Sequence, residues 1–285
     1  GSGRWTMMYL TAPTVLRVRP GTLARDERFD FNLANAEAAH GVRRRSPQWQ
    51  LPPRSDSALD IETHGAAALR MARAGMDRVP CILFDCRSGH LISGPAPSYK
   101  LAVRAGLQRT PPVLLHGQGG LEPLQAMRFF AGMGSSAEVG ALAMASSSGG
   151  IVVSACFVSR QPFVGRQLRV HGLALARDAS DPEAALVSAM TTLMRQSDSM
   201  PPTWRLTPHG FDDIDIRHRR GVAALPALSP SVPDASRERD ALQVLAGLAG
   251  QVQPSDGAGL LVFMGSAGSV KGLVVSLIDM TEVPA

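Results

Sequence analysis

One stretch near the middle of the chain decides the fold. Residues 113–121 read VLLHGQGGL, so a short apolar run leads into a glycine-rich turn, and a helix is predicted behind it over residues 121–132. A strand, a tight turn and a helix in this order are typical of α/β enzymes, which often place a nucleophile at the turn because the helix N-terminus stabilises negative charge there. Here the exposed position is Gln118, and an amide is not a nucleophile.

The glycines of this turn also have a simpler interpretation. They let the chain reverse and let the helix pack closely on the sheet, whatever the function. A phosphate-binding loop is disfavoured, because no Gly-Lys-Ser/Thr follows and the glycine spacing differs from that of a dinucleotide-binding turn. His116, beside the glycines, is more simply a hydrogen-bonded structural residue than a catalyst.

The same rhythm of strands and helices extends outward from this stretch. In the first half, strands are predicted over residues 9–18, 79–84, 113–115, 141–145 and 151–158, a helix over 55–74, an irregular or helical stretch over 29–39, and a loop with a short helix over 95–106. In the second half, strands are predicted over 168–176, 204–206, 260–264 and 272–278, and helices over 181–194 and 236–249. The helix at 181 is expected to be capped by Asp178, Ser180 or Asp181.

Alternation of this kind predicts an α/β fold with sheets covered on both faces, because many of the strands are continuously apolar. The two halves look alike, which suggests an internal duplication. We expect one half over residues 1–160 and the other over residues 161–285.

Composition excludes several classes of protein. The chain has 285 residues, 45% of them hydrophobic, so it is neither disordered nor collagen-like. The formal net charge is +5, with 29 Lys+Arg against 24 Asp+Glu, and only two of the basic residues are lysines. No basic helix, Cys/His cluster or aromatic platform accompanies the charge, so nucleic-acid binding is not expected.

Cysteine and histidine usage sets further expectations. Cys81, Cys86 and Cys156 lie in apolar, strand-like surroundings, and an odd number of cysteines favours a reducing compartment. The seven histidines show no metal-site spacing, so neither a metal nor a cofactor is expected. No apolar run reaches the roughly 18 residues of a membrane span, and no signal segment follows the opening Gly1-Ser2-Gly3. We therefore expect a cytoplasmic protein without a membrane partner.

Several segments, read in order, resemble a known family. They are AHGVRRR at 39–45, the helix and strand across 66–84, PSYKLAVRAGL at 97–107, the turn at Gln118, and VQPSDGAGLLVFMGSAG at 252–268. Together they are similar to thiolase-fold ketosynthases of the ketoacyl-ACP synthase III type. The resemblance implies two duplicated βαβαβ-type halves in a layered α-β-α-β-α arrangement.

The resemblance also implies an active site that this chain has largely lost. Such enzymes use a Cys nucleophile at a helix N-terminus, together with a His and an Asn. The resemblance places Gln118 at the cysteine position and His209 at the histidine position, while residues 228–236 offer no counterpart of the asparagine. Asn35 and Ala39 stand where the family's coenzyme A clamp has Trp and Arg. The linker at 146–150 is short where active relatives carry a longer insertion.

These losses lead to one preferred hypothesis. The chain resembles the catalytically silent subunits of ketosynthase pairs, such as the chain-length factors of type II polyketide synthases and the inactive subunit of the alkylquinolone synthase pair. Its expected role is to scaffold and shape the acyl pocket of an active synthase III-like partner, in a heterodimer or heterotetramer. The reaction supported would be carbon–carbon condensation in polyketide-type or alkylquinolone-type biosynthesis. Acyl carrier protein or acyl-CoA would engage through that partner.

Two other hypotheses remain open. The chain could be a stand-alone ketosynthase-like decarboxylase, in which Gln118 and His209 stabilise an enolate without covalent capture. It could also be a binding or regulatory protein that holds a small ligand in the former acyl pocket.

Overall fold

The structure is a computed structural model that describes residues 6–18, 61–73, 76–88, 91, 96–134, 138–146, 151–178, 180–197, 202–206, 240–264 and 269–281. The stretch at 29–39, with Asn35 and Ala39, lies outside these residues. So do His209, the segment 228–236, and most of the linker at 146–150.

Ten strands form one continuous, strongly bent sheet. Its order is β4-β3-β5-β6-β1-β7-β10-β9-β8, and β2 also pairs with β6. The strands are β1 (Met8–Thr11), β2 (Thr14–Val18), β3 (Ile82–Arg87), β4 (Pro112–His116), β5 (Val139–Ser146), β6 (Ile151–Ser159), β7 (Gly165–Arg177), β8 (Pro202–Leu206), β9 (Ala258–Met264) and β10 (Ser269–Met280).

The described helices are α2 (Ile61–Ala72), α3 (Pro97–Arg104), α4 (Glu122–Gly132), α5 (Pro182–Gln196) and α7 (Ala241–Gln251), with a short 3₁₀ turn, η3, at Pro254–Asp256. Two of the helices begin at an aspartate whose carboxylate accepts a backbone N–H three residues on. Asp181 caps α5 and Asp240 caps α7. The cap of α5 is thus one of the three residues that the sequence suggested.

The pairing pattern of the first half recurs in the second. In the first half β3 runs parallel to β5, β5 antiparallel to β6, and β6 antiparallel to β1. In the second half β8 runs parallel to β9, β9 antiparallel to β10, and β10 antiparallel to β7. Within the described residues, β4 has no counterpart in this correspondence, and β2, which pairs with β6 beside β1, has none as a separate strand. The predicted duplication is confirmed, while the boundary drawn at residue 160 stays a prediction.

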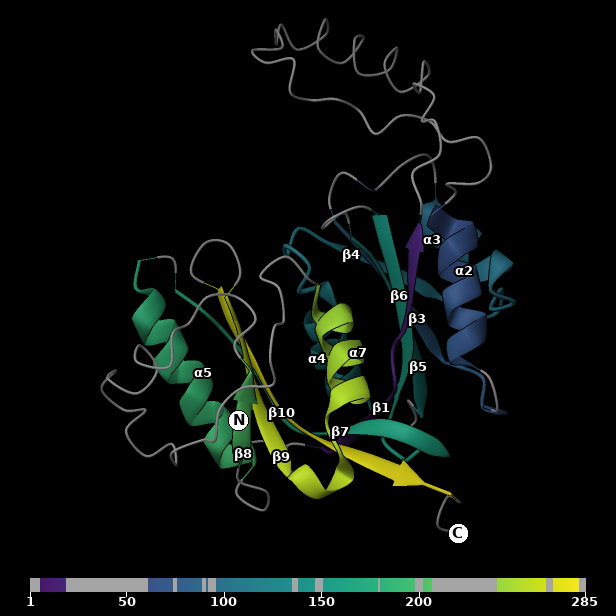
Figure 1. The fold of residues 1–285 in the computed structure, drawn as a ribbon. Coiled ribbons are helices and arrows are strands. Elements are labelled where there is room, and N and C mark those ends of the chain that lie inside the picture. Colours follow the sequence, from purple (N-terminus) through teal and green to yellow (C-terminus); the bar gives the residue numbers. More distant parts are fainter. Residues whose placement is uncertain are drawn as a thin grey trace, which may run out of the picture.

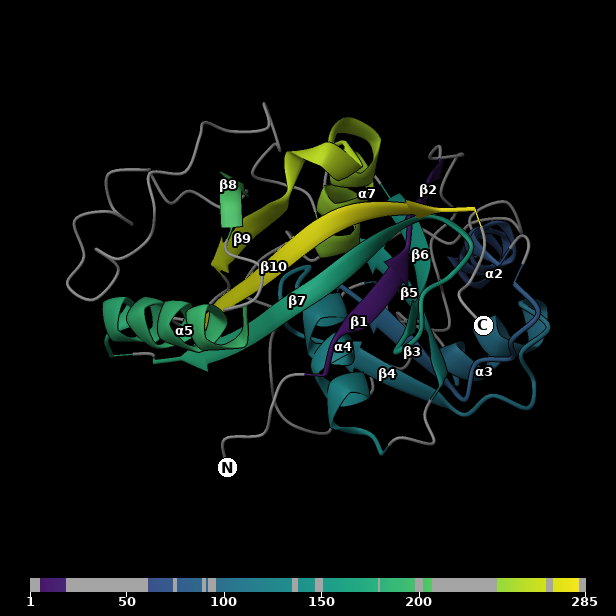
Figure 2. The same cartoon turned by 90° about the horizontal axis from the view of Figure 1, so that it is seen from below.

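Three hydrophobic clusters lie between the layers. Figure 1 shows the order of the helices, from α5 at the left, through α4 and α7, to α2 and α3 at the right. The central cluster joins α4 and α7 to the inner faces of both halves. A second cluster packs α2 and α3 on the first half, and a third packs α5 on the second half. Seen from below in Figure 2, β7 and β10 run side by side between the two ends of the molecule. This is the expected α-β-α-β-α arrangement.

Three expectations about local structure were wrong. The apolar run at 113–115 predicts a buried strand, but β4 ends the sheet order and its side chains are half-buried or exposed. Strand β3 begins at Ile82 and not at Val79, and both Val79 and Cys81 are exposed. Cys86 and Cys156, which the apolar sequence around them predicts to be buried, are buried. The single strand predicted over 9–18 is two strands, since Pro13 lies between β1 and β2.

Within the described residues, no helix is both long enough and apolar enough to cross a membrane.

Candidate functional site

The turn before α4 is built from glycines in a left-handed conformation. Gly117, Gly119 and Gly120 have φ values of 81°, 62° and 92°. At Gly120 the neighbouring chain also leaves little room, because an added Cβ would lie 3.3 Å from the Cα and Cβ atoms of Asp240. The glycine at this position therefore lets two segments approach each other closely.

That close approach brings the starts of α4 and α7 together. The Ala241 N–H donates to the Gly120 carbonyl over 2.9 Å. The Asp240 carboxylate, at the N-terminus of α7, accepts the Ser146 hydroxyl from the end of β5. We call the region formed by Gln118, Gly120, Glu122, Asp240 and Lys271 the α4/α7 junction.

A buried carboxylate occupies the turn at the α4/α7 junction. The residue before α4 is Leu121, whose side chain cannot cap the helix. Instead, the fully buried Glu122 folds back. Its Oε1 accepts the Gln118 N–H over 2.8 Å, and its Oε2 accepts the Gly120 N–H over 2.9 Å. The positive end of the helix also favours a carboxylate here, so the chain supplies its own anion at the turn.

A lysine from the second half reaches the same turn. Lys271 of β10 is only 3% exposed, and its Nζ donates to the Gln118 Oε1 over 2.9 Å and to the Leu121 carbonyl over 3.3 Å. Burial lowers the pKa of Lys271 to about 8, against the smaller, opposing effects of Glu122 and Cys86. The Gln118 side chain is thus held by an ammonium group from the other half of the fold.

Two other titratable groups, at or beside the α4/α7 junction, have raised pKa values. Burial raises the pKa of Asp240, although hydrogen bonds from Ser146 and Gln243 oppose the shift. Burial, with the negative charge of Asp85, raises the pKa of the Cys86 thiol well above its usual value. Because only the thiolate is a good nucleophile, Cys86 is unsuited to attack a thioester.

The structure places the three predicted site residues differently. Gln118 lies half-buried at the turn, directly before α4, as the sequence suggested. His116 ends β4 with an exposed side chain, and within the described residues it makes no hydrogen bond to Gln118. His209 lies outside the described residues. Glu122, Asp240 and Lys271 were not predicted from the sequence.

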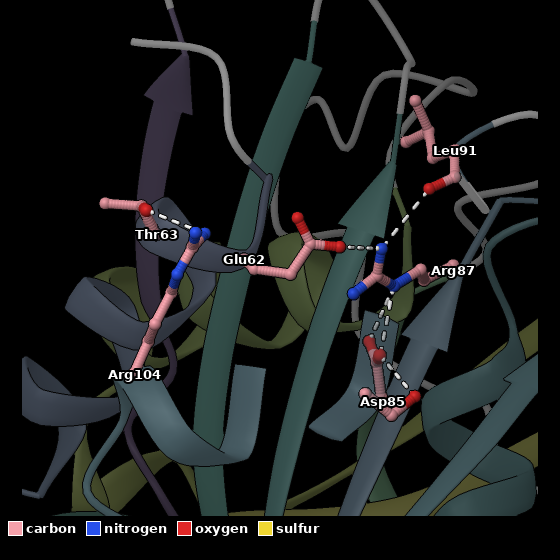
Figure 3. A network of polar contacts seen from close by, with 7 residues as sticks. Glu62, Thr63, Asp85, Arg87, Leu91 and Arg104 are labelled. Carbon is pink, nitrogen blue, oxygen red and sulfur yellow. Dashed lines mark hydrogen bonds and ion pairs between the residues drawn. The ribbon is translucent and has the colours of Figure 1, made fainter. Parts of the chain in front are cut away.

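A second buried polar cluster lies away from the α4/α7 junction, between β3 and α2 (Figure 3). The Arg87 guanidinium bridges Asp85 of its own strand, at 2.9 Å, and Glu62 of α2, at 2.7 Å. Ser98 of α3 donates to Asp85 over 2.7 Å. Nearer the surface, Arg104 donates to Thr63 over 3.0 Å. These contacts tie α2 and α3 to the end of β3, so we assign the cluster a structural role.

Within the described residues, no group of three or more His, Cys, Asp or Glu side chains could hold a metal ion. The α4/α7 junction instead holds the half-buried amide of Gln118, the buried carboxylate of Glu122 and the buried amine of Lys271. The amine binds the Gln118 amide oxygen, and the carboxylate binds the backbone of the turn. In this arrangement the turn has no nucleophilic thiolate, and its Gln118 and Gly120 amides are already bound to Glu122.

Comparison with known proteins shows similarity in structure only. No protein-family model matches the sequence, and no curated protein matches it. Among solved structures, ChlB3, described as an acyltransferase, is similar with a TM-score of 0.61 and 12% identity, over 96% of this chain and 98% of that one. A variant of OleA from Xanthomonas campestris gives 0.58 and 10%, over 96% and 100%. The 3-oxoacyl-(acyl carrier protein) synthase III of Xanthomonas oryzae gives 0.54 and 12%, over 96% and 98%.

These similarities extend along nearly the whole length of each chain, so they establish the fold. The chain has the thiolase-like fold of synthase III-type condensing enzymes, as the sequence resemblance implied.

Proposed function

We propose that this chain is a catalytically silent subunit of a ketosynthase heterodimer, which scaffolds and shapes the acyl pocket of an active synthase III-like partner. The partner would carry out carbon–carbon condensation in polyketide-type or alkylquinolone-type biosynthesis. The observation that carries the proposal is the turn before α4, where Gln118 stands without a thiol and Glu122 already binds the backbone amides of Gln118 and Gly120.

Condensation by a thioester route needs two things that this turn lacks. One is a nucleophile to take the acyl group. The other is a set of backbone or side-chain donors free to bind the oxyanion that develops in the transition state. With its amides donated to an internal carboxylate, the turn supports acyl capture poorly. Chemistry would then come from the partner.

The edge of the sheet at β4 supports a subunit interface. β4 lies at one end of the strand order, and an exposed sheet edge is a template for pairing with another chain. Exposed apolar side chains surround this edge on α3, β4 and α4, namely Tyr99, Val103, Val113 and Phe129. Burying such a surface stabilises both partners.

The hydrogen-bonding pattern of β4 favours a non-identical partner. The Leu83 N–H of β3 donates to the Pro111 carbonyl, so residues 113 and 115 also bond toward β3, and 112, 114 and 116 face outward. In an antiparallel pair of two identical β4 strands centred on Leu114, His116 would meet Pro112. Proline has no N–H, so each such pair would lack one bond. A partner strand without proline at this position would form the missing hydrogen bond.

Co-expression tests the proposal. We expect the chain alone to aggregate or to be poorly stable, and an intact synthase III-like protein encoded beside it, with Cys, His and Asn, to recover a soluble complex. In that complex, Leu114→Pro should abolish co-purification, because it removes an outward N–H but no bond to β3. Leu114→Ala, which keeps the N–H, is the matched control. A stable monomer that binds no such partner would contradict the proposal.

A further inference from the structure

Lys271 is an unusual residue for the place it occupies. The chain contains two lysines, and the other, Lys100, lies exposed on α3. Lys271 instead sits in the apolar run of β10, between Leu175 of β7 and Phe263 of β9. A buried ammonium loses its hydration, so an apolar side chain of similar size would fit this position at lower cost in stability. The position therefore points to a use for the amine.

The surroundings of Lys271 make its neutral form more accessible than that of an exposed lysine. Its hydrogen-bond acceptors, the Gln118 amide and the Leu121 carbonyl, are uncharged. The titratable groups that act on it are Glu122 of α4 and the Cys86 thiol of β3, and burial outweighs both, so the pKa falls to about 8. Roughly a tenth of the amine is then neutral at pH 7. A neutral lysine amine has a free lone pair and adds to carbonyl carbon.

Access to the amine is through the turn. The Gln118 side chain, which accepts the Lys271 hydrogen bond, is half-buried, and Gly117 and Gly119 on either side of it are exposed. Within the described residues, open space lies where a Cβ would project from each of these glycines. Rotation of the Gln118 side chain would break its hydrogen bond to the Lys271 Nζ and remove this cover from the amine.

The charges nearby restrict what could bind there. Glu122 is a buried carboxylate at the same junction, and a negatively charged ligand would be repelled by it. An uncharged electrophile meets no such barrier.

We propose that Lys271 is a covalent ligand site, which takes an uncharged aldehyde or ketone as an imine beneath the Gln118 side chain. In this step the Nζ lone pair adds to the carbonyl carbon, and a carbon–nitrogen bond forms. The carbonyl oxygen leaves as water together with the two amine protons, and the product is the neutral imine. The site does not depend on a partner subunit, so the outcome of its test is independent of the proposed function.

Reductive trapping tests the site, with Lys100 as the internal control. The full-length protein is incubated with butanal and cyanoborohydride at pH 7.5, and labelling of the two lysines is followed by peptide mass spectrometry. An amine with a pKa of 8 has a neutral fraction on the order of a hundredfold larger than an ordinary lysine at this pH. After allowance for restricted access, we expect Lys271 to be labelled at least about tenfold faster than Lys100.

Two variants test whether the Gln118 side chain covers the amine and whether labelling of the two lysines is independent. Gln118→Ala should accelerate labelling of Lys271 and leave that of Lys100 unchanged, because it removes the covering amide. Lys100→Arg should leave the rate at Lys271 unchanged. Labelling in guanidinium chloride establishes that both peptides are detected. A rate at Lys271 equal to or below that at Lys100 in the folded protein would overturn the proposal.

Discussion

Replacing Glu122 by alanine is expected to lower the free energy of unfolding by about 3 kcal/mol. The carboxylate accepts the N–H groups of both Gln118 and Gly120, and each amide left without an acceptor in a buried place costs roughly 1–3 kcal/mol. The substitution also removes the negative charge that partly offsets the burial of the Lys271 ammonium.

The matched control for this prediction is Glu122→Gln, which keeps the shape but offers one acceptor oxygen in place of two. It should lose about half as much stability as the alanine variant, since one amide keeps its acceptor. Urea unfolding of the three proteins measures the difference. If Glu122→Ala changed the free energy of unfolding by less than about 0.5 kcal/mol, the internal carboxylate would not be what holds the turn.

Lys271→Met is expected to change how stability depends on pH. The pKa of Lys271 is about 8 in the folded protein, below its ordinary value of 10.5. Between these values the unfolded chain binds more protons than the folded chain, so the free energy of unfolding rises with pH. For the wild-type protein, this rise in the free energy of unfolding amounts to about 3 kcal/mol by pH 10.5. The Lys271→Met variant lacks this rise.

Any stability advantage of Lys271→Met should therefore be greatest below pH 8 and should shrink by about 3 kcal/mol toward pH 10.5. Ionisation of the cysteines in the unfolded state affects both proteins and cancels in the difference. Lys100→Met, at an exposed position, is the control and should show no such trend. A stability difference between wild type and Lys271→Met that is independent of pH would show that the folded protein does not disfavour the Lys271 ammonium.

Much of the fold could be predicted from the sequence because local signals and tertiary packing agree. The helices at α4 and α5 follow a turn or a capping aspartate, and the strands at β5, β6 and β10 are rich in apolar residues. The position of β4 at the edge of the sheet could not be predicted from such local signals. An apolar run of three residues looks the same whether it will be covered by its own chain or by a partner.

The candidate site was predictable only in part. The glycines around Gln118 predicted the turn, and the family resemblance placed Gln118 at the position of the catalytic cysteine. Glu122 and Lys271 carried weaker signals, an acid in the first turn of a helix and a lone charge within an apolar strand. Nothing in the sequence indicates that Lys271 bonds to the turn that Glu122 holds, because the contacts of Lys271 with Gln118 and Leu121 arise from the packing of the two halves.

The most direct test of catalytic silence is carbon dioxide release from a malonyl thioester by the soluble, folded fraction of the isolated protein. With no thiolate at the turn and its amides bound to Glu122, we predict no release above the rate without protein, and no acyl adduct by mass spectrometry. Release that is lost in Gln118→Ala would contradict the account, and would establish instead a decarboxylase that uses Gln118 and His209.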